Sequence, residues 1–402
     1  MTAKWNLLLR KQSSSECQWL GRSNARRRLL PSSVWASQKH LVGSCKEQND
    51  ELEKRGFRLL SARSPAPPPF PRALIGGQPP SLRAWPRLPR AAARPSNLPN
   101  TASAMQQPAE LARPRAPDHT VSLNTGAPLP LLGLGTFRLR DEETLRLSLD
   151  AALGSGYRLV DTAAVYGNEA ALGRALGELL PRHGLARGDV FLTSKLSPRD
   201  QGEGPARAAC LRSLQELGCD YLDLCLIHWP GTQGRPQEDE GNRECRRLSW
   251  QALERLHEAG KLRAIGVSNY TVRHLQELLA HCRVVPAVLQ VEFHPELAQS
   301  ALLDFCRQKG IHLQAYSSLG AGHLVGRPEV TEVARRRGRT PAQVLLRWAL
   351  QQGVSVIPKS ACPARVAENA QLWDWELSPA DMELLGGMDC GRRYCWDPSE
   401  VA

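Results

Sequence analysis

The sequence predicts an α/β fold, a (β/α)8 TIM barrel whose lower end is closed by an N-terminal β-hairpin and which follows a disordered tail. Two observations carry this prediction. Eight short, mostly apolar runs follow one another between residues 131 and 360, as expected of strands buried on both faces. Amphipathic segments lie between them, so the chain alternates β and α units over a length that suits such a barrel.

The first element of the ordered region is the hairpin, in "TVSLNTGAPLPLLG", where a glycine follows Asn-Thr at the turn. Eight predicted strands come after it. They are 131–137, 158–163, 189–196, 221–229, 262–269, 287–293, 312–319 and 354–360.

Helices are predicted between these strands, for example over 141–153, 168–180 and 249–260. Several of the helical segments end at glycine, which commonly stops a helix. A doubly wound sheet is the rival fold, but it requires a glycine-rich phosphate loop after its first strand. The first run, "GLGTF", holds only two such glycines and no third one opening a helix. The barrel is therefore favoured.

Charge and proline divide the chain into two parts. Residues 1–118 hold 20 Lys and Arg against 7 Asp and Glu, whereas residues 119–402 hold 32 against 33. Half of the 30 prolines also lie in the first part. Such a segment cannot bury enough apolar surface to fold, so we expect residues 1–118 to be a disordered basic, Pro/Arg-rich extension and 119–402 to form the barrel. Because the basic excess is confined to the extension, no nucleic-acid partner is expected for the barrel.

The remaining composition bears on the compartment. The 11 cysteines show no metal-ligand spacing, so neither a metal site nor disulfides are expected, and a cytoplasmic location follows. No apolar run is long enough to cross a membrane. Residues 1–46 are basic and rich in serine, which leaves a mitochondrial transit peptide as the alternative. An extension from an upstream start codon is the other interpretation, since Met105 stands just before the ordered region.

Candidate catalytic residues stand at the carboxyl ends of three successive strands, where barrels carry their active sites. They are Asp161, Tyr166 in the following loop, Lys195 and His228. A nearby ammonium lowers the pKa of a phenol, so Lys195 could tune Tyr166 as a general acid. Asp161 would keep Lys195 charged and aimed, and His228 could orient a substrate carbonyl. Each residue alone has an ordinary structural explanation, but their convergence on one rim makes a coincidence improbable.

Several motifs together resemble the aldo-keto reductase family. They are "GLGTF", "DTAAVYGNE", "SKL", "DLCLIHWP", "GKLRAIGVSNY", "FHPELAQ", "AYSSLG" and "IPKSACPARVAEN", in the family's order over roughly residues 119–400. The resemblance implies a monomeric oxidoreductase that uses NADPH to reduce a small carbonyl substrate. It also implies that Asp161, Tyr166, Lys195 and His228 form the catalytic tetrad.

The resemblance also implies the cofactor-binding residues. Ser268, Asn269 and Gln290 match positions that hold the nicotinamide carboxamide, and Tyr316 matches the ring that stacks on the nicotinamide. Lys359, Ser360 and Arg365 match the grip on the 2′-phosphate, for which a lysine, a hydroxyl and an arginine fork are suitable groups. The full expected set is Gly135, Thr136, Phe137, Asp161, Ser268, Asn269, Gln290, Tyr316, Ser317, Leu319, Lys359, Ser360, Arg365, and, for the adenine, Glu368 and Asn369.

The chain departs from the family pattern at three places. Leu289 stands where the family often has asparagine, Ser318 where it often has proline, and Tyr270, a conservative change, where it usually has phenylalanine. The resemblance implies that three segments wall the substrate pocket, and here they are short or polar; they are 231–250, 320–328 and the C-terminal 390–402. We therefore expect an open pocket for small or polar carbonyl compounds, with His228 and Trp229 as its substrate-binding residues. Two other functions remain open: a regulatory or scaffold protein that binds NADP(H) with little turnover, and an anion-binding role for the basic tail.

Overall fold

The computed structural model describes residues 119–402. The predictions made for the extension, including the transit peptide at residues 1–46, lie outside the described residues. Within the described part, eight strands form one sheet, and each is hydrogen-bonded in parallel to its neighbour in the chain. The backbone N–H of Gly133 donates to Val356 at 2.9 Å, and that of Gly135 donates to Pro358 at 3.1 Å. These bonds join the first strand to the last and close the barrel.

Every strand of the barrel lies inside one of the predicted runs. In chain order they are β3 (Leu134–Gly135), β4 (Leu159–Asp161), β5 (Phe191–Leu196), β6 (Leu224–Ile227), β7 (Ile265–Ser268), β8 (Val288–Glu292), β9 (His312–Tyr316) and β10 (Ser355–Val356). Glycine is required where the backbones approach most closely. A Cβ on Gly266 would lie 2.4 Å from the carbonyl oxygen of Val288 on the adjacent strand.

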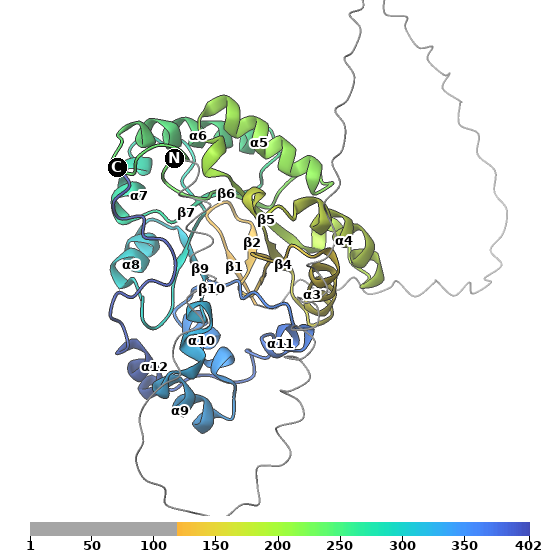
Figure 1. Ribbon diagram of the computed structural model, residues 1–402, viewed down its shortest axis with the longest axis vertical. Coiled ribbons are helices and arrows are strands. Elements are labelled where there is room, and N and C mark those ends of the chain that lie inside the picture. Colours follow the sequence, from red (N-terminus) through yellow and green to blue (C-terminus); the bar gives the residue numbers. More distant parts are fainter. Residues whose placement is uncertain (1–118) are drawn as a thin grey trace, which may run out of the picture. The chain divides into compact units, whose positions relative to one another are not determined.

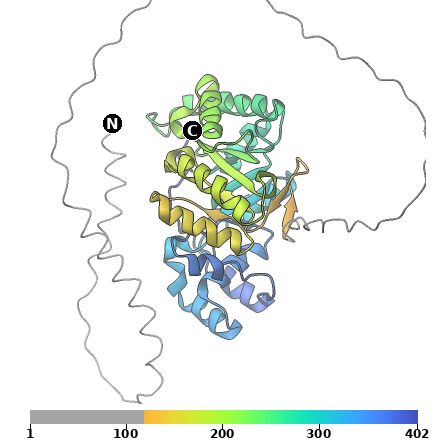
Figure 2. The ribbon, with the colours of Figure 1, turned by 90° about the vertical axis from the view of Figure 1, so that its right-hand side faces the viewer.

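The predicted hairpin is present as β1 (Thr120–Ser122) and β2 (Pro128–Pro130), which pair antiparallel around a turn that contains Gly126 with φ of 81°. Leu123 and Leu129 are buried against inward-facing barrel residues such as Leu159 and Phe191. Burying each leucine contributes about 1.5–3 kcal/mol. Figure 2 shows the hairpin projecting at one end of the barrel, so the prediction of a closed lower end is confirmed.

Helices surround the strands (Figure 1). They are α3 (Glu142–Gly154), α4 (Glu169–Arg182), α5 (Glu203–Glu216), α6 (Gly241–Glu258), α7 (Val272–Leu279), α8 (Ser300–Gln308), α9 (Pro328–Arg337), α10 (Pro341–Leu350), α11 (Pro363–Glu368) and α12 (Pro379–Gly386). Side-chain caps fix several of their starts. Asp141 accepts a bond from the backbone N–H of Thr144 at 2.8 Å, and Thr340 and Ser378 each begin a capping box.

The described cysteines are all free thiols, and the nearest pair, Cys210 and Cys225, keeps its sulfur atoms 3.7 Å apart. Within residues 119–402, no helix has the length and apolar character that a membrane crossing needs.

Candidate active site

The centre of the site is the ammonium of Lys195, which is buried at the carboxyl end of β5. Its Nζ donates to Asp161 Oδ1 at 2.5 Å, to the carbonyl oxygen of Thr162 at 2.9 Å and to the hydroxyl of Tyr166 at 3.3 Å. Three acceptors for three N–H groups satisfy the buried ammonium. Burial lowers the pKa of Lys195, but Asp161 and Tyr166 outweigh that effect and raise it above its usual value. Lys195 is therefore held as a cation.

Three effects act on the pKa of the Tyr166 phenol, and they do not all have the same sign. Burial raises its pKa most, the Lys195 ammonium lowers it, and the Asp161 carboxylate raises it again. The net pKa of Tyr166 lies above the ordinary value of a phenol. The charge of Lys195 thus lowers the pKa of Tyr166, as the sequence predicted. The expectation that the net pKa of Tyr166 is lowered was wrong, because desolvation outweighs the effect of Lys195. Tyr166 consequently keeps its proton at neutral pH, which a proton donor requires.

His228 follows β6, and its ring lies 5.7 Å from that of Tyr166 in an edge-on arrangement at 75°. Burial, aided by the positive charge of Lys195, lowers the pKa of His228 to about 3. The imidazole is therefore neutral. Its Nδ1 is buried and has no hydrogen-bond partner among the described residues. A neutral ring beside the phenol can donate or accept a hydrogen bond to a small molecule placed between them.

The residues expected to hold the carboxamide gather on the same rim, on β7, β8 and β9. Asn269, which follows β7 with φ of 64°, donates to the carbonyl oxygen of His228 at 2.9 Å and to Ser268 Oγ at 3.1 Å. The hydroxyl of Tyr316 donates to Asn269 Oδ1 at 2.7 Å. Gln290 donates to Asp161 Oδ2 at 2.7 Å, which ties this group directly to the tetrad.

The loop after β3 completes this rim. Both the backbone N–H and the hydroxyl of Thr136 donate to the carbonyl oxygen of Asp161, at 3.0 and 2.9 Å. The ring of Phe137 lies 5.1 Å from Tyr166 and is 40% exposed. Asn168, which the sequence analysis missed, holds the loop in place. Its amide donates to the carbonyl oxygens of Thr136 and Leu139, both at 3.0 Å, and it accepts a bond from Thr162.

The residues expected to bind the 2′-phosphate and adenine lie together after β10, with no hydrogen bond to the tetrad among the described contacts. The side chains of Lys359 and Arg365 both reach solvent. Neighbouring groups still remove part of the water around Lys359, and this desolvation, together with the charge of Arg138, lowers the pKa of Lys359. Ser360 Oγ is bonded within its own turn, to the backbone of Cys362. Nearby, Glu368 accepts from Thr340 at 2.8 Å. Asn369 is buried, and its Oδ1 has no partner among the described residues.

The loop that holds Trp229 follows β6 and His228, and the segment after α12 contacts the end of β8 and the loop after β9. Gln201 fixes the Trp229 loop by donating to the carbonyl oxygens of Trp229, at 2.7 Å, and of Gly231, at 3.0 Å. The carboxylate of Glu292, which ends β8 and is 1% exposed, accepts bonds from the backbone N–H groups of Tyr394 and Cys395, at 2.7 and 3.1 Å. These bonds bring Cys395 Sγ to 3.4 Å from Ser317 Oγ. Leu319 is partly buried beside them.

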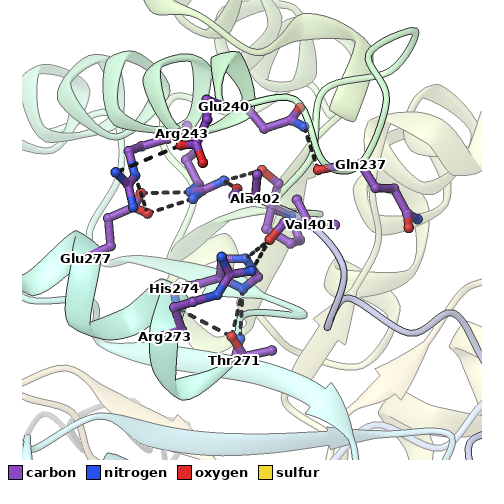
Figure 3. Close-up of polar contacts among 12 residues, drawn as sticks. Gln237, Glu240, Arg243, Thr271, Arg273, His274, Glu277, Val401 and Ala402 are labelled. Carbon is purple, nitrogen blue, oxygen red and sulfur yellow. Dashed lines mark hydrogen bonds and ion pairs between the residues drawn. The ribbon is translucent and has the colours of Figure 1, made fainter.

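The last two residues, Val401 and Ala402, are hydrogen-bonded to side chains of α6 and α7 (Figure 3). Arg246 is 3% exposed, pairs with Glu277 at 2.7 Å and donates to the carbonyl oxygen of Ala402 at 2.5 Å. Arg273 and His274 donate to the carbonyl oxygen of Val401, His274 at 2.8 Å. Hydrogen bonds therefore hold residues 394–395 to β8 and residues 401–402 to α6 and α7.

The chain was compared with known proteins. The family model "Aldo/keto reductase family" matches residues 131–389. Glyoxal reductase of Bacillus subtilis (strain 168) is 43% identical over 282 residues, which cover 70% of this chain and 97% of the relative. The chain belongs to the aldo-keto reductase family. A relative named aldo-keto reductase, from Mycolicibacterium vanbaalenii, is 44% identical over 280 residues and covers 69% of this chain and 95% of its own length.

Solved structures agree with this membership. An aldo-keto reductase from a Medee basin deep-sea metagenome library, MGS-M4, is 35% identical with a TM-score of 0.64, over 71% of this chain and all of the other. The aldose reductase of Schistosoma japonicum is 37% identical with a TM-score of 0.63, over 68% of this chain and 93% of its own. The predicted family and barrel fold are confirmed. Enzymes of this family generally reduce carbonyl compounds with a nicotinamide cofactor.

We expect this aldo-keto reductase to lose stability in acid, because several of its histidines are buried in the neutral form. Burial lowers the pKa of His228 to about 3 and those of His274 and His312 to about 4, from 6.5. Below pH 6.5 the unfolded chain binds protons that the folded chain does not. The free energy of unfolding should therefore fall by about 1.4 kcal/mol per pH unit for each histidine. The fall should level off below about pH 4 for His274 and His312 and below about pH 3 for His228.

Urea unfolding at pH 7.0, 5.5 and 4.5 checks this expectation. His274→Gln should reduce the slope of stability against pH, whereas His281→Gln, at an exposed position, should leave it unchanged. Equal stability at pH 7.0 and 4.5 would contradict the assignment of neutral histidines.

Proposed function

We propose that the protein is an NADPH-dependent reductase of aldehydes and ketones in which Tyr166 is the general acid. The observation that carries the proposal is the set of contacts around Lys195, whose ammonium meets both Asp161 at 2.5 Å and the Tyr166 hydroxyl at 3.3 Å. A protonated phenol beside a buried cation, at the carboxyl edge of a barrel, is suited to protonate a carbonyl oxygen.

The nicotinamide supplies the hydride when the cofactor is bound. The roles of the side chains follow from their positions. A carbonyl oxygen between Tyr166 and His228 would accept a hydrogen bond from each, because His228 is neutral and its buried Nδ1 has no partner among the described residues. As negative charge develops on that oxygen, the Tyr166 proton moves to it. The Lys195 ammonium then stabilises the resulting phenolate, with Asp161 balancing its charge.

Several features of the structure suit a dinucleotide with a 2′-phosphate. The exposed cations Lys359 and Arg365, with Arg138 close to Lys359, offer charge to a phosphate. The unpartnered Oδ1 of the buried Asn369 can accept a hydrogen bond from an amino group such as that of adenine. Tyr316 presents a ring on the rim beside Asn269, where a nicotinamide could stack.

The choice of cofactor can be tested at Arg365. Arg365→Ala should weaken NADPH binding about 10- to 100-fold and NADH binding less than about 3-fold, because only NADPH offers a charged group to the guanidinium. The dissociation constants are measured by titration of tryptophan fluorescence. Arg307→Ala on α8, which removes an arginine that pairs with Asp304 at 3.2 Å, is the control and should change neither. Equal affinity of the unaltered protein for NADPH and NADH would contradict the preference.

We further propose that the substrates are small or polar carbonyl compounds and that the protein acts as a monomer. The similarity to glyoxal reductase of Bacillus subtilis supports this size of substrate. NADPH oxidation should be followed with glyoxal, short aldehydes and a steroid ketone. Turnover with the small aldehydes and none with the steroid is expected. An absence of turnover with every aldehyde, despite NADPH binding, would reject the catalytic function.

A further inference from the structure

Both N–H groups of the Gln290 side-chain amide donate hydrogen bonds inside the barrel. Its Nε2 donates to Asp161 Oδ2 at 2.7 Å and to Gln314 Oε1 at 2.8 Å. The three residues come from β4, β8 and β9, and each is at most 2% exposed. Together with the bond between Lys195 and Asp161 they form a buried chain of hydrogen bonds that runs from the catalytic lysine across to β9.

This arrangement allows a single orientation of the Gln290 amide. Rotating the amide by 180° would place its Oε1 against the Asp161 carboxylate and the Gln314 carbonyl, so that acceptors would face acceptors. The Asp161 carboxylate alone already disfavours the rotated amide, but a single bond would still allow the plane of the amide to tilt; the second bond, to Gln314, restrains that plane from another direction. Gln314 thus accepts the second hydrogen bond from the Gln290 amide and completes the restraint.

The fixed orientation leaves the Gln290 Oε1 as a hydrogen-bond acceptor to which no described group donates. Next to Gln290 in the register of the sheet is Ser268, whose hydroxyl receives a bond from Asn269 and keeps its own proton to donate. The amide of Asn269 is fully engaged by His228, Ser268 and Tyr316. One acceptor beside one donor is the complement of a primary carboxamide, which has an N–H to give and an oxygen to accept.

We propose that Gln314 is a positioning residue for cofactor recognition: it fixes the Gln290 amide so that Oε1 accepts the carboxamide N–H of the nicotinamide. The inference rests on the proposed function, since it requires a nicotinamide in the site. Among the described residues Gln314 has no hydrogen bond to the tetrad, and it acts through Gln290.

Gln314 carries an energetic cost in the folded protein, which supports a specific role. Its own Nε2 is buried and has no partner among the described residues. A buried unpaired N–H is unfavourable, and a plain apolar residue on β9 would avoid it. The acceptor that Gln314 offers to Gln290 is the contact that such a residue would lose.

The experiment compares binding of NADP⁺ with binding of its 3-acetylpyridine analogue, which keeps the carbonyl oxygen but lacks the amide N–H. Gln314→Met, close to glutamine in shape, should weaken NADP⁺ binding about 10-fold and binding of the analogue less than about 2-fold. Gln290→Met should show the same loss of discrimination. The double variant should be no worse than Gln290→Met alone, because the two residues act in series.

Two further variants make the result decisive. Thr193→Val removes an unpartnered buried hydroxyl on β5 and should leave the preference for NADP⁺ unchanged. Gln314→Glu keeps an oxygen acceptor for Gln290 and should retain the preference, which keeps the proposal testable if Gln314→Met does not fold. Equal weakening of both dinucleotides by Gln314→Met, an additive double variant, or a Gln314→Glu protein without the preference would each overturn the proposal. Failure of the unaltered protein to bind NADP⁺ would instead reject the proposed function.

Discussion

Replacing Tyr166 by phenylalanine is expected to lower turnover at least about 100-fold while NADPH binding stays within about 2-fold, as is typical of losing a positioned general acid. The substitution removes the hydroxyl that lies 3.3 Å from Lys195 and leaves the ring that packs against Phe137 and His228. The affinity for the cofactor should therefore survive, and the proton donor should not.

Steady-state reduction of a short aldehyde and fluorescence titration with NADPH measure the two quantities separately. Tyr221→Phe is the matched control, since that ring lies between Arg187 and Arg263, away from the rim, at 4.4 and 3.6 Å from their guanidinium carbons. It should turn over normally. Turnover within a few-fold of normal in Tyr166→Phe would remove Tyr166 from the chemistry and leave water or His228 as the donor.

Much of the fold could be predicted because barrel strands are buried on both faces and appear in the sequence as continuous apolar runs. The run 354–360 contains β10, and 131–137 contains β3, although each strand has only two residues in the ladder. Their short length could not be predicted, since strand ends depend on how the tilted strands meet as the barrel closes. The hairpin was predictable from its turn glycine.

The four candidate catalytic residues could be found because Asp161, Lys195 and His228 stand at the carboxyl ends of successive strands and Tyr166 follows the first of them, and the structure brings all four together. The buried polar residues that support it could not. Gln314, Glu292 and Asn168 stand among ordinary polar residues in the sequence, and only the register of the barrel shows that they point inward or anchor loops. The net pKa of Tyr166 was missed for a related reason, because desolvation depends on how closely the neighbouring elements pack.

Asp161→Asn should reduce turnover about 10- to 100-fold, and its effect on the pH profile separates an electrostatic role from a structural one. The two carboxylate oxygens of Asp161 accept from different donors, Oδ1 from Lys195 and Oδ2 from Gln290. An asparagine offers one acceptor and one N–H in their place. Either Lys195 or Gln290 must then face an N–H and lose its partner.

The sign of the expected pH shift follows from the charges. Asp161 raises the pKa of Lys195 against the lowering effect of burial, and it also raises the pKa of Tyr166. Without that carboxylate, the pKa of Lys195 falls. The pKa of Tyr166 falls as well, as long as Lys195 is still protonated. Because reduction needs a protonated Tyr166 and a charged Lys195, the loss of activity on the alkaline side should move to lower pH.

Asp223→Asn is the matched control for this experiment. Asp223 is also buried and ion-paired, with Arg187 at 2.8 Å and Arg263 at 3.3 Å, and it accepts from the backbone N–H of Leu192 outside the rim. Its replacement should lower the melting temperature and leave the pH–rate profile unchanged. If Asp161→Asn behaves like Asp223→Asn, with lower stability and an unaltered profile, Asp161 serves only to hold the strand ends together. A shifted alkaline limb in Asp161→Asn alone would assign it to the charge balance that keeps Lys195 a cation beside Tyr166.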